Sequence, residues 1–186
     1  MKNLPKFKYH PNPIETGAFK TDESKICDCC EQEADIYYDG HFYSIKNVEY
    51  LCPDCIASGK AADKFDGEFQ DYLSIEGISP DPAVPSAFDN PEAIDEVTKR
   101  TPGYSGWQQE VWLTCCGDLC AFMGYVGWPE VERMGLADEI SKDMAEEFGT
   151  DAVETAKKYC RNGSSLQGYL SRCLHCKKHR LHVDCD

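Results

Sequence analysis

Closely spaced pairs of cysteines are the feature that most constrains how this chain of 186 residues folds. Twelve of its residues are cysteine, and two Cys-x-x-Cys pairs, Cys27 with Cys30 and Cys52 with Cys55, are separated by 21 residues. No apolar stretch follows the basic start MKNLPKFKYHPNP, so we expect no export signal and a reduced, cytoplasmic protein. Paired cysteines in that environment indicate metal binding or redox chemistry rather than disulfides.

The first two pairs predict a structural zinc site. Each Cys-x-x-Cys turn directs two thiolates at one point, and a hairpin between the pairs brings the two turns together. We expect that hairpin at Ile36–Tyr38 and Phe42–Ile45, with a turn at Asp39-Gly40 and a helix after Cys52. A knuckle, a hairpin and a pair that opens a helix are typical of a treble clef. The competing interpretation is a redox dithiol. Cys29 is the weaker ligand because adjacent thiolates do not easily bind one ion, so the expected ligands are Cys27, Cys30, Cys52 and Cys55.

The C-terminal cysteines predict a second zinc site. Cys173 and Cys176 form another knuckle between strand-like flanks, and the segment TCCGDLC offers three further cysteines. Cys116 and Cys120 have three residues between them, which is within the range for chelation, whereas Cys115 in place of either is the alternative. The expected ligands of this second zinc ion are therefore Cys116, Cys120, Cys173 and Cys176.

Neither expected site has the composition of a catalytic metal centre. Four cysteines saturate zinc, whereas catalytic sites keep a position open for water and usually include histidine or carboxylate. None of the five histidines stands in an HExxH motif, and the alternative to a bystander role is that His179 or His182 replaces a cysteine ligand. The segment Trp107–Glu110 is the one candidate for a substrate pocket, although such aromatic residues usually belong to a core.

The charge of the chain argues against nucleic acid as a partner. The formal net charge is -14, and it is uneven, because the residues from Tyr159 to the end carry +3 and the first 158 carry -17. An acidic surface repels phosphates, so only the basic tail around Lys177, Lys178 and Arg180 is a candidate for such contacts. No apolar run approaches the ~18 residues of a membrane span.

Turn residues and periodicity divide the chain into an α+β arrangement of small zinc modules, short hairpins and packed helices. Four prolines mark residues 74–91 as a loop, and Asn90-Pro91 is a good start for a short helix. We expect a strand at AFMGYVGW, one helix or a helix pair at PEVERMGLADEISKDMAEEF, and two strands around the last cysteine knuckle. The segment WQQEVWL is compatible with a helix or a strand.

The chain resembles the bacterial CbrC family. The resemblance rests on CPDCIASGKAADKF, TPGYSGWQQEVWLTCCGDLCAFMGYVGW and SRCLHCKKHRLHVDCD, and it covers residues 1–186 as one domain. Within it we expect a treble-clef-like module at 22–73, the loop at 74–91, and helices with a zinc-ribbon-like module at 92–186. One departure is Lys177, which stands where the family has glycine after the last knuckle cysteine.

The resemblance implies a small bacterial protein of undetermined biochemistry, linked to a two-component regulator and to colicin tolerance. Together with two saturated sites, it favours a non-enzymatic cytoplasmic protein that holds two zinc ions and contacts an unidentified protein partner. An enzyme with a pocket around Trp107–Glu110 is the alternative, and nucleic-acid binding through the tail is a weaker one.

Overall fold

A computed structural model describes residues 4–186, so the first residues of the segment examined for an export signal lie outside it. The chain mixes short helices with short antiparallel strands and is therefore of the α+β class, as the sequence predicts. It forms two compact units, which meet in sequence between Ser105 and Gly106. Residues 92–105 belong to the first unit, so this division differs from the boundaries expected from the sequence.

The first unit contains four two-residue strands, and they do not form the expected hairpin. β1 (Phe19–Lys20) pairs with β4 (Tyr37–Tyr38), and β2 (Lys25–Ile26) pairs with β3 (Glu33–Ala34). The predicted return strand Phe42–Ile45 is wrong, because within it only Tyr43 forms a bridge, and its partner is Glu68.

Tyr38 pairs instead with Leu51, through an isolated antiparallel bridge. The ring of buried Tyr38 lies against Gly40, and a Cβ at residue 40 would be only 2.7 Å from it. A larger residue at this position would therefore clash with the ring.

Helical segments follow the second cysteine pair. The expected helix is divided into α1 (Pro53–Ala57) and α2 (Lys60–Phe65), because Gly59 between them has a left-handed φ of +75°. A 3-10 turn spans Tyr72–Ser74, and α3 spans Pro91–Arg100. The expected start of α3 is confirmed, since the Asn90 side chain accepts a hydrogen bond from the main chain of Ala93.

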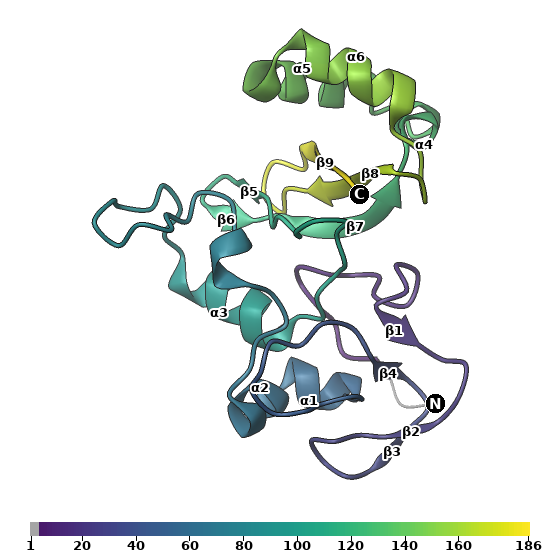
Figure 1. The fold of residues 1–186 in the computed structure, drawn as a ribbon, viewed down its shortest axis with the longest axis vertical. Helices are drawn as coiled ribbons and strands as arrows, with labels where there is room; N and C mark the ends of the chain where they lie inside the picture. Colours follow the sequence, from purple (N-terminus) through teal and green to yellow (C-terminus); the bar gives the residue numbers. More distant parts are fainter. Residues whose placement is uncertain (1–3) are drawn as a thin grey trace. The chain divides into compact units, whose positions relative to one another are not determined.

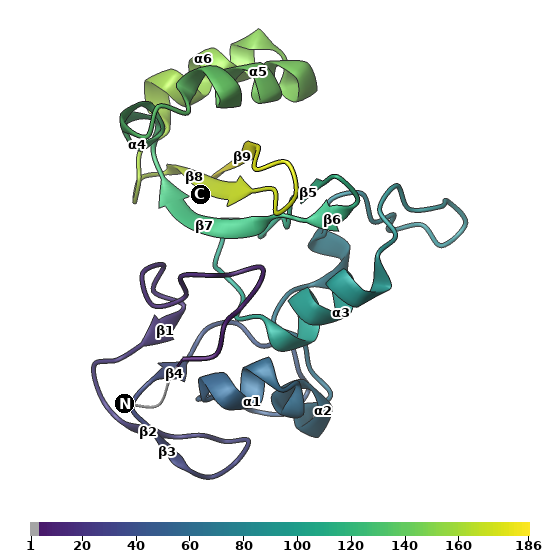
Figure 2. The ribbon, with the colours of Figure 1, turned by 180° about the vertical axis from the view of Figure 1, so that it is seen from behind.

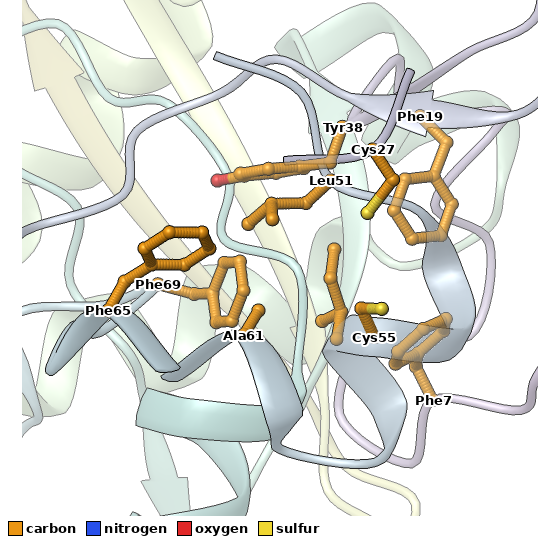
Figure 3. Close-up of a cluster of buried hydrophobic side chains, with 10 residues drawn as sticks. Phe7, Phe19, Cys27, Tyr38, Leu51, Cys55, Ala61, Phe65 and Phe69 are labelled. Atoms are coloured by element: carbon orange, nitrogen blue, oxygen red, sulfur yellow. The ribbon is translucent and has the colours of Figure 1, made fainter. Parts of the chain in front are cut away.

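Aromatic side chains form the core of the first unit, and two cysteines of the first quartet are part of it. Figure 3 shows Cys27 and Cys55 beside these rings, which come from the N-terminal segment, β1, β4 and α2. Both cysteines are almost fully buried. The core therefore fixes the positions of one cysteine from each Cys-x-x-Cys pair.

The second unit is a three-stranded antiparallel sheet with helices on one side (Figures 1 and 2). The sheet has the order β7 (Ala121–Val126), β8 (Leu166–Arg172) and β9 (His179–Cys185), and a small hairpin of β5 (Thr114–Cys115) and β6 (Asp118–Leu119) precedes it. The helices are α4 (Trp128–Arg133), α5 (Ala137–Phe148) and α6 (Thr150–Tyr159).

This architecture confirms the strand at β7, the helix pair at α4 and α5 and the two terminal strands, but α6 was not expected. Residues 107–113 form neither a helix nor a strand of the sheets. Among the described residues, no helix is long and apolar enough to cross a membrane.

The helices pack on the sheet through a second apolar core, which contains Val131, Ile140, Val153, Leu170 and Leu181. Ion pairs add to it along α5, because Asp143 contacts both Lys178 and Arg180 of the terminal segment. Glu147, one helical turn further along α5, also pairs with Arg180 at 2.6 Å. The terminal knuckle is therefore attached to α5 by charge as well as by packing.

Candidate metal centres

The structure brings eight cysteine sulfurs into two groups of four, within each of which all sulfurs lie within 4.8 Å of one another. Four sulfurs bound tetrahedrally at about 2.3 Å from a zinc ion lie about 3.8 Å apart. Cys30 and Cys52 are 3.8 Å apart in the first group, and Cys115 and Cys176 are 3.7 Å apart in the second. Both groups therefore have the dimensions of a four-thiolate zinc centre.

The first group consists of the four cysteines that the spacing predicts: Cys27, Cys30, Cys52 and Cys55. Cys52 lies directly before α1 and Cys55 in its first turn, so the helix start sets the spacing of this pair. Asp28 attaches the knuckle to the second pair, because its carboxylate accepts hydrogen bonds from the main chain of Glu49 and Tyr50, at 2.7 and 2.9 Å.

Lys64 of α2 closes the knuckle from the other side. Its ammonium group donates to the main-chain oxygens of Asp28 and Cys29, at 2.9 and 2.7 Å. The Cys29 thiol is outside the quartet but within hydrogen-bonding reach of the Cys55 thiol, and burial raises the pKa of Cys29.

Cys27 receives the hydrogen bonds that stabilise a thiolate. The Cys52 thiol donates to it, and so do the main-chain N–H groups of Cys30, Cys52 and Cys29; together they lower the pKa of Cys27 to about 4, although burial opposes the shift. The main-chain nitrogen of Cys52 lies 3.2 Å from the Cys27 sulfur. Cys27 therefore loses its proton easily, as a metal ligand must.

The second group corrects one residue of the expected ligand set. It consists of Cys115, Cys116, Cys173 and Cys176, so Cys115 stands in the place expected for Cys120. Cys120 is fully buried and packs with Leu113 and Cys173, and its main-chain oxygen accepts a hydrogen bond from the Trp112 indole at 2.9 Å.

The β5–β6 turn is the physical reason for this correction. Cys116 and Gly117 form a two-residue turn in which both φ angles are positive, +55° and +72°. This conformation places the Cys116 sulfur 3.7 Å from that of its neighbour Cys115. Two adjacent cysteines in ordinary backbone do not easily bind one ion, but the left-handed turn lets the sulfurs of Cys115 and Cys116 point to the same place.

Polar contacts attach the terminal knuckle to this turn. His175 Nε2 lies 2.9 Å from the buried Asp118 carboxylate, and Arg180 donates to the main-chain oxygen of Thr114 at 2.9 Å. At Cys173 burial acts to raise the pKa, but main-chain N–H groups of Cys176 and His175 outweigh it and the pKa falls to about 6. Asp118 and His175 support the site without belonging to the quartet, which the sequence alone did not indicate.

The two knuckles share one main-chain design. In each, the first cysteine donates its N–H to the oxygen five residues later: Cys27 to Gln32 at 2.9 Å and Cys173 to Lys178 at 2.8 Å. The residue after the second cysteine is left-handed in both, although it is Glu31 in one and Lys177 in the other. The histidines considered as replacement ligands, His179 and His182, are in neither group of four cysteines.

The segment Trp107–Glu110 is held against the sheet of the second unit. The Trp107 indole donates to the Ser164 oxygen at 3.0 Å, and its main-chain N–H donates to the Tyr169 hydroxyl at 3.1 Å. The main chain of Gln108 donates to the Asp184 carboxylate at 2.7 Å. These contacts attach the segment to β8 and β9, and within it Glu110 is buried.

Comparison with known proteins assigns the chain to a family without assigning it an activity. A UPF0167 protein of Mycobacterium bovis is 40% identical over 98% of this chain and 94% of its own length. A UPF0167 protein of Pseudomonas aeruginosa is 35% identical over 98% of this chain and 97% of its own. No solved structure matches the chain. The model of an uncharacterised protein family, UPF0167, matches residues 4–185, and the chain belongs to that family.

Proposed function

We propose that the chain is a non-enzymatic zinc protein in which two four-thiolate sites stabilise the fold, and that it acts through contacts with other proteins. The observation that carries this proposal is the gathering of eight sulfurs into two quartets of zinc-like dimensions. Four thiolates complete the coordination of zinc, so no position is left for a substrate or a reactive water. Zinc bound in this way contributes directly to folding free energy.

The cellular setting in this proposal is the bacterial cytoplasm, in a stress or colicin-tolerance response. Its support is the resemblance to the CbrC family together with twelve cysteines, none of them in a disulfide. Thiols in the cytoplasm stay reduced and available to zinc.

Binding of nucleic acid through the tail has less support. Lys178 and Arg180, two of the three basic residues considered for it, are ion-paired with Asp143 at 2.5 and 3.2 Å. A phosphate would have to displace these carboxylate partners within an acidic chain.

An enzyme that uses Trp107–Glu110 is the second candidate, favoured by the half-exposed Trp107 beside the buried Glu110. Trp107 and Gln108 donate hydrogen bonds to the Ser164 main-chain oxygen, to the Tyr169 hydroxyl of β8 and to the Asp184 carboxylate of β9, which hold the segment in place. Such contacts suit a structural segment better than a substrate site.

Cobalt substitution tests the proposal. Chain loaded with Co²⁺ should bind two ions and show the sulfur-to-cobalt charge-transfer bands of tetrahedral four-thiolate sites, unchanged by added azide or imidazole. Spectral changes on adding those ligands would reveal an open coordination position and overturn the structural assignment. Elemental analysis of the native protein should find two zinc ions, and a ratio well below one would contradict both sites.

A further inference from the structure

Helices α5 and α6 leave a hollow between themselves and the sheet of the second unit. Both helices lie on the same side of that sheet (Figures 1 and 2), and the hollow has a volume of about 410 Å³. Small-molecule sites in proteins usually have volumes of about 300–1,000 Å³. No cysteine of either quartet lines the hollow, so it is distinct from the candidate metal centres.

The sheet side of the hollow is aliphatic. It consists of Leu166 of β8 and of Leu181 and Val183 of β9, which all pack toward the helices. His182 also lines the hollow, but its ring contacts the ring of Tyr169, its partner in the ladder, at 5.8 Å between centroids. Because alternate side chains of a strand point to opposite faces, the imidazole lies on the other face of the sheet.

Small residues on α6 explain why this space is not filled. Ala152, Thr155 and Ala156 line the hollow, and their spacing of three and four residues places them on one face of the helix. Larger side chains at these positions would occupy the space, as they do in a close-packed core. The Thr155 hydroxyl already donates to the main-chain oxygen of Asp151 at 2.8 Å, so it has a partner within the helix.

The hollow has a buried floor and an exposed mouth. Met144, Ala156 and Leu181 belong to the floor, and each of them is almost fully buried. Phe148 and Asp151 also line the hollow, but Phe148 is 58% exposed and Asp151 is exposed as well. A ligand with an apolar body and a polar end would therefore bury the first at the floor and keep the second in water at the mouth.

The Asp151 carboxylate determines the sign of the charge at the mouth. Asp151 is the one acidic residue among those that line the hollow, and within residues 4–186 its side chain makes no hydrogen bond or ion pair. α5 ends at Phe148 and α6 begins at Thr150, so the negative partial charge of one helix end offsets the positive partial charge of the other. A cation on the ligand is therefore complementary to the mouth.

A fatty acid or another apolar anion suits the hollow less well. Lys178 and Arg180, the basic residues on the terminal segment beside α5, are already paired with Asp143 and Glu147 of that helix. The whole chain carries -14. An anionic ligand would therefore meet the Asp151 carboxylate without a free basic partner to offset it.

We propose that this hollow binds a small organic cation, with an apolar chain or ring at the floor and a protonated amine beside Asp151. This inference goes beyond the proposed function, because it adds a small-molecule ligand to a protein proposed to act through protein contacts. A ligand held between α5, α6 and the sheet also stabilises the second unit by mass action.

Titration with simple amines, followed by nuclear magnetic resonance, tests the proposal. The probe is n-hexylamine at pH 7, added to the full-length chain with labelled Leu, Val and Met methyl groups. The methyl signals of Met144, Leu166, Leu181 and Val183 should shift and saturate together. From propylamine to hexylamine, the affinity should rise about threefold to fourfold with each methylene. The absence of saturable shifts at these methyl groups overturns the proposal.

The charge of the ligand is tested with 1-hexanol and with a matched pair of variants on α6. Asp151→Asn should weaken hexylamine binding about two- to fivefold and leave hexanol binding unchanged. Glu154→Gln removes a carboxylate that does not line the hollow and should change neither. Equal losses for amine and alcohol in Asp151→Asn, or no loss for the amine, would contradict a cation site.

The shape of the hollow is tested by filling it. Ala152→Phe should abolish binding of both hexylamine and hexanol, and retained binding would place the ligand elsewhere and overturn the proposal. If this variant loses zinc or secondary structure, the methyl shifts of the native chain and the Asp151→Asn comparison still decide.

Metal analysis of the same samples separates this inference from the proposed function. A chain that holds two zinc ions but gives no methyl shifts would remove only the ligand site. A chain that binds hexylamine as expected but holds no zinc would keep the ligand site and overturn the proposed function.

Discussion

At the scale of single residues, each knuckle contains one non-glycine residue in a backbone conformation that favours glycine. Glu31 and Lys177 follow the second cysteine of each knuckle with φ of +61° and +67°. For a residue with a Cβ, this left-handed region costs about 1–2 kcal/mol. Both knuckles therefore contain strain that the surrounding hydrogen bonds must hold in place.

Replacing Lys177 by glycine should stabilise the zinc-loaded chain. Relief of strain, less the greater freedom of glycine in the unfolded chain, predicts a gain of about 0.5–1 kcal/mol. For a domain of this size the melting temperature should rise by about 1–4 °C, which calorimetry can measure. The matched variant Lys177→Ala keeps the Cβ and should give no rise. Equal melting temperatures of the glycine and alanine variants would contradict the explanation.

His10 is a second residue whose environment has a measurable consequence. Its side chain is fully buried, with Nδ1 2.8 Å from the Pro102 oxygen and Nε2 2.6 Å from the Thr16 hydroxyl. Burial lowers the pKa of His10 from 6.5 to about 4, although the hydrogen bond to Pro102 opposes this. The unfolded chain therefore binds a proton near pH 6.5, whereas the folded chain does so only near pH 4.

The contribution of neutral His10 to stability is present above pH 6.5 and is lost as the pH falls toward 4. Between pH 6.5 and 5 this group should reduce the free energy of unfolding by about 2 kcal/mol. Urea denaturation should give free energies of unfolding for the native chain and for His10→Gln whose difference changes by that amount as the pH falls. A constant difference between them across this range would show that His10 is not the cause.

At the scale of elements, the β5–β6 hairpin decides which cysteines meet. Its left-handed turn at Cys116-Gly117 brings Cys115 into the second quartet, and the strand that follows leads Cys120 into the core. Cys115→Ser should therefore lower the zinc content from two ions to about one, whereas Cys120→Ala should retain two. Elemental analysis of the two purified variants measures this. Loss of zinc on Cys120→Ala alone would restore the ligand set expected from spacing.

At this scale, the sequence predicts the features that depend only on residues close together in the chain. The first quartet, the start of α3 at Asn90-Pro91 and the strand β7 depend on short spacing, capping and turn chemistry. The choice of Cys115 was not predictable in this way, because it depends on a left-handed conformation at Cys116, which non-glycine residues rarely adopt. The misplaced strand Phe42–Ile45 has a similar cause, since Tyr43 pairs with the distant Glu68.

At the scale of the whole molecule, each of the two compact units contains one quartet. Ending the chain before Cys173 removes two ligands of the second quartet together with β9, and uncovers apolar residues of β7 and β8. The truncated chain should bind about one zinc ion and aggregate more readily than the full chain. Elemental analysis and light scattering measure the two effects. A soluble truncated chain that still binds two ions would show that the terminal knuckle is not a ligand pair.

The sequence distance spanned by each quartet also orders events during synthesis. Cys30 and Cys52 are separated by 21 residues, whereas 56 residues lie between Cys116 and Cys173. At about 5–20 residues per second, the ribosome needs roughly 3–11 s to make that second interval. All four cysteines of the first quartet are made before the second unit. Cys115 and Cys116 are made before Cys173 and Cys176, the other two cysteines of their quartet. In the proposed zinc protein, the first site is therefore able to bind its ion before the second.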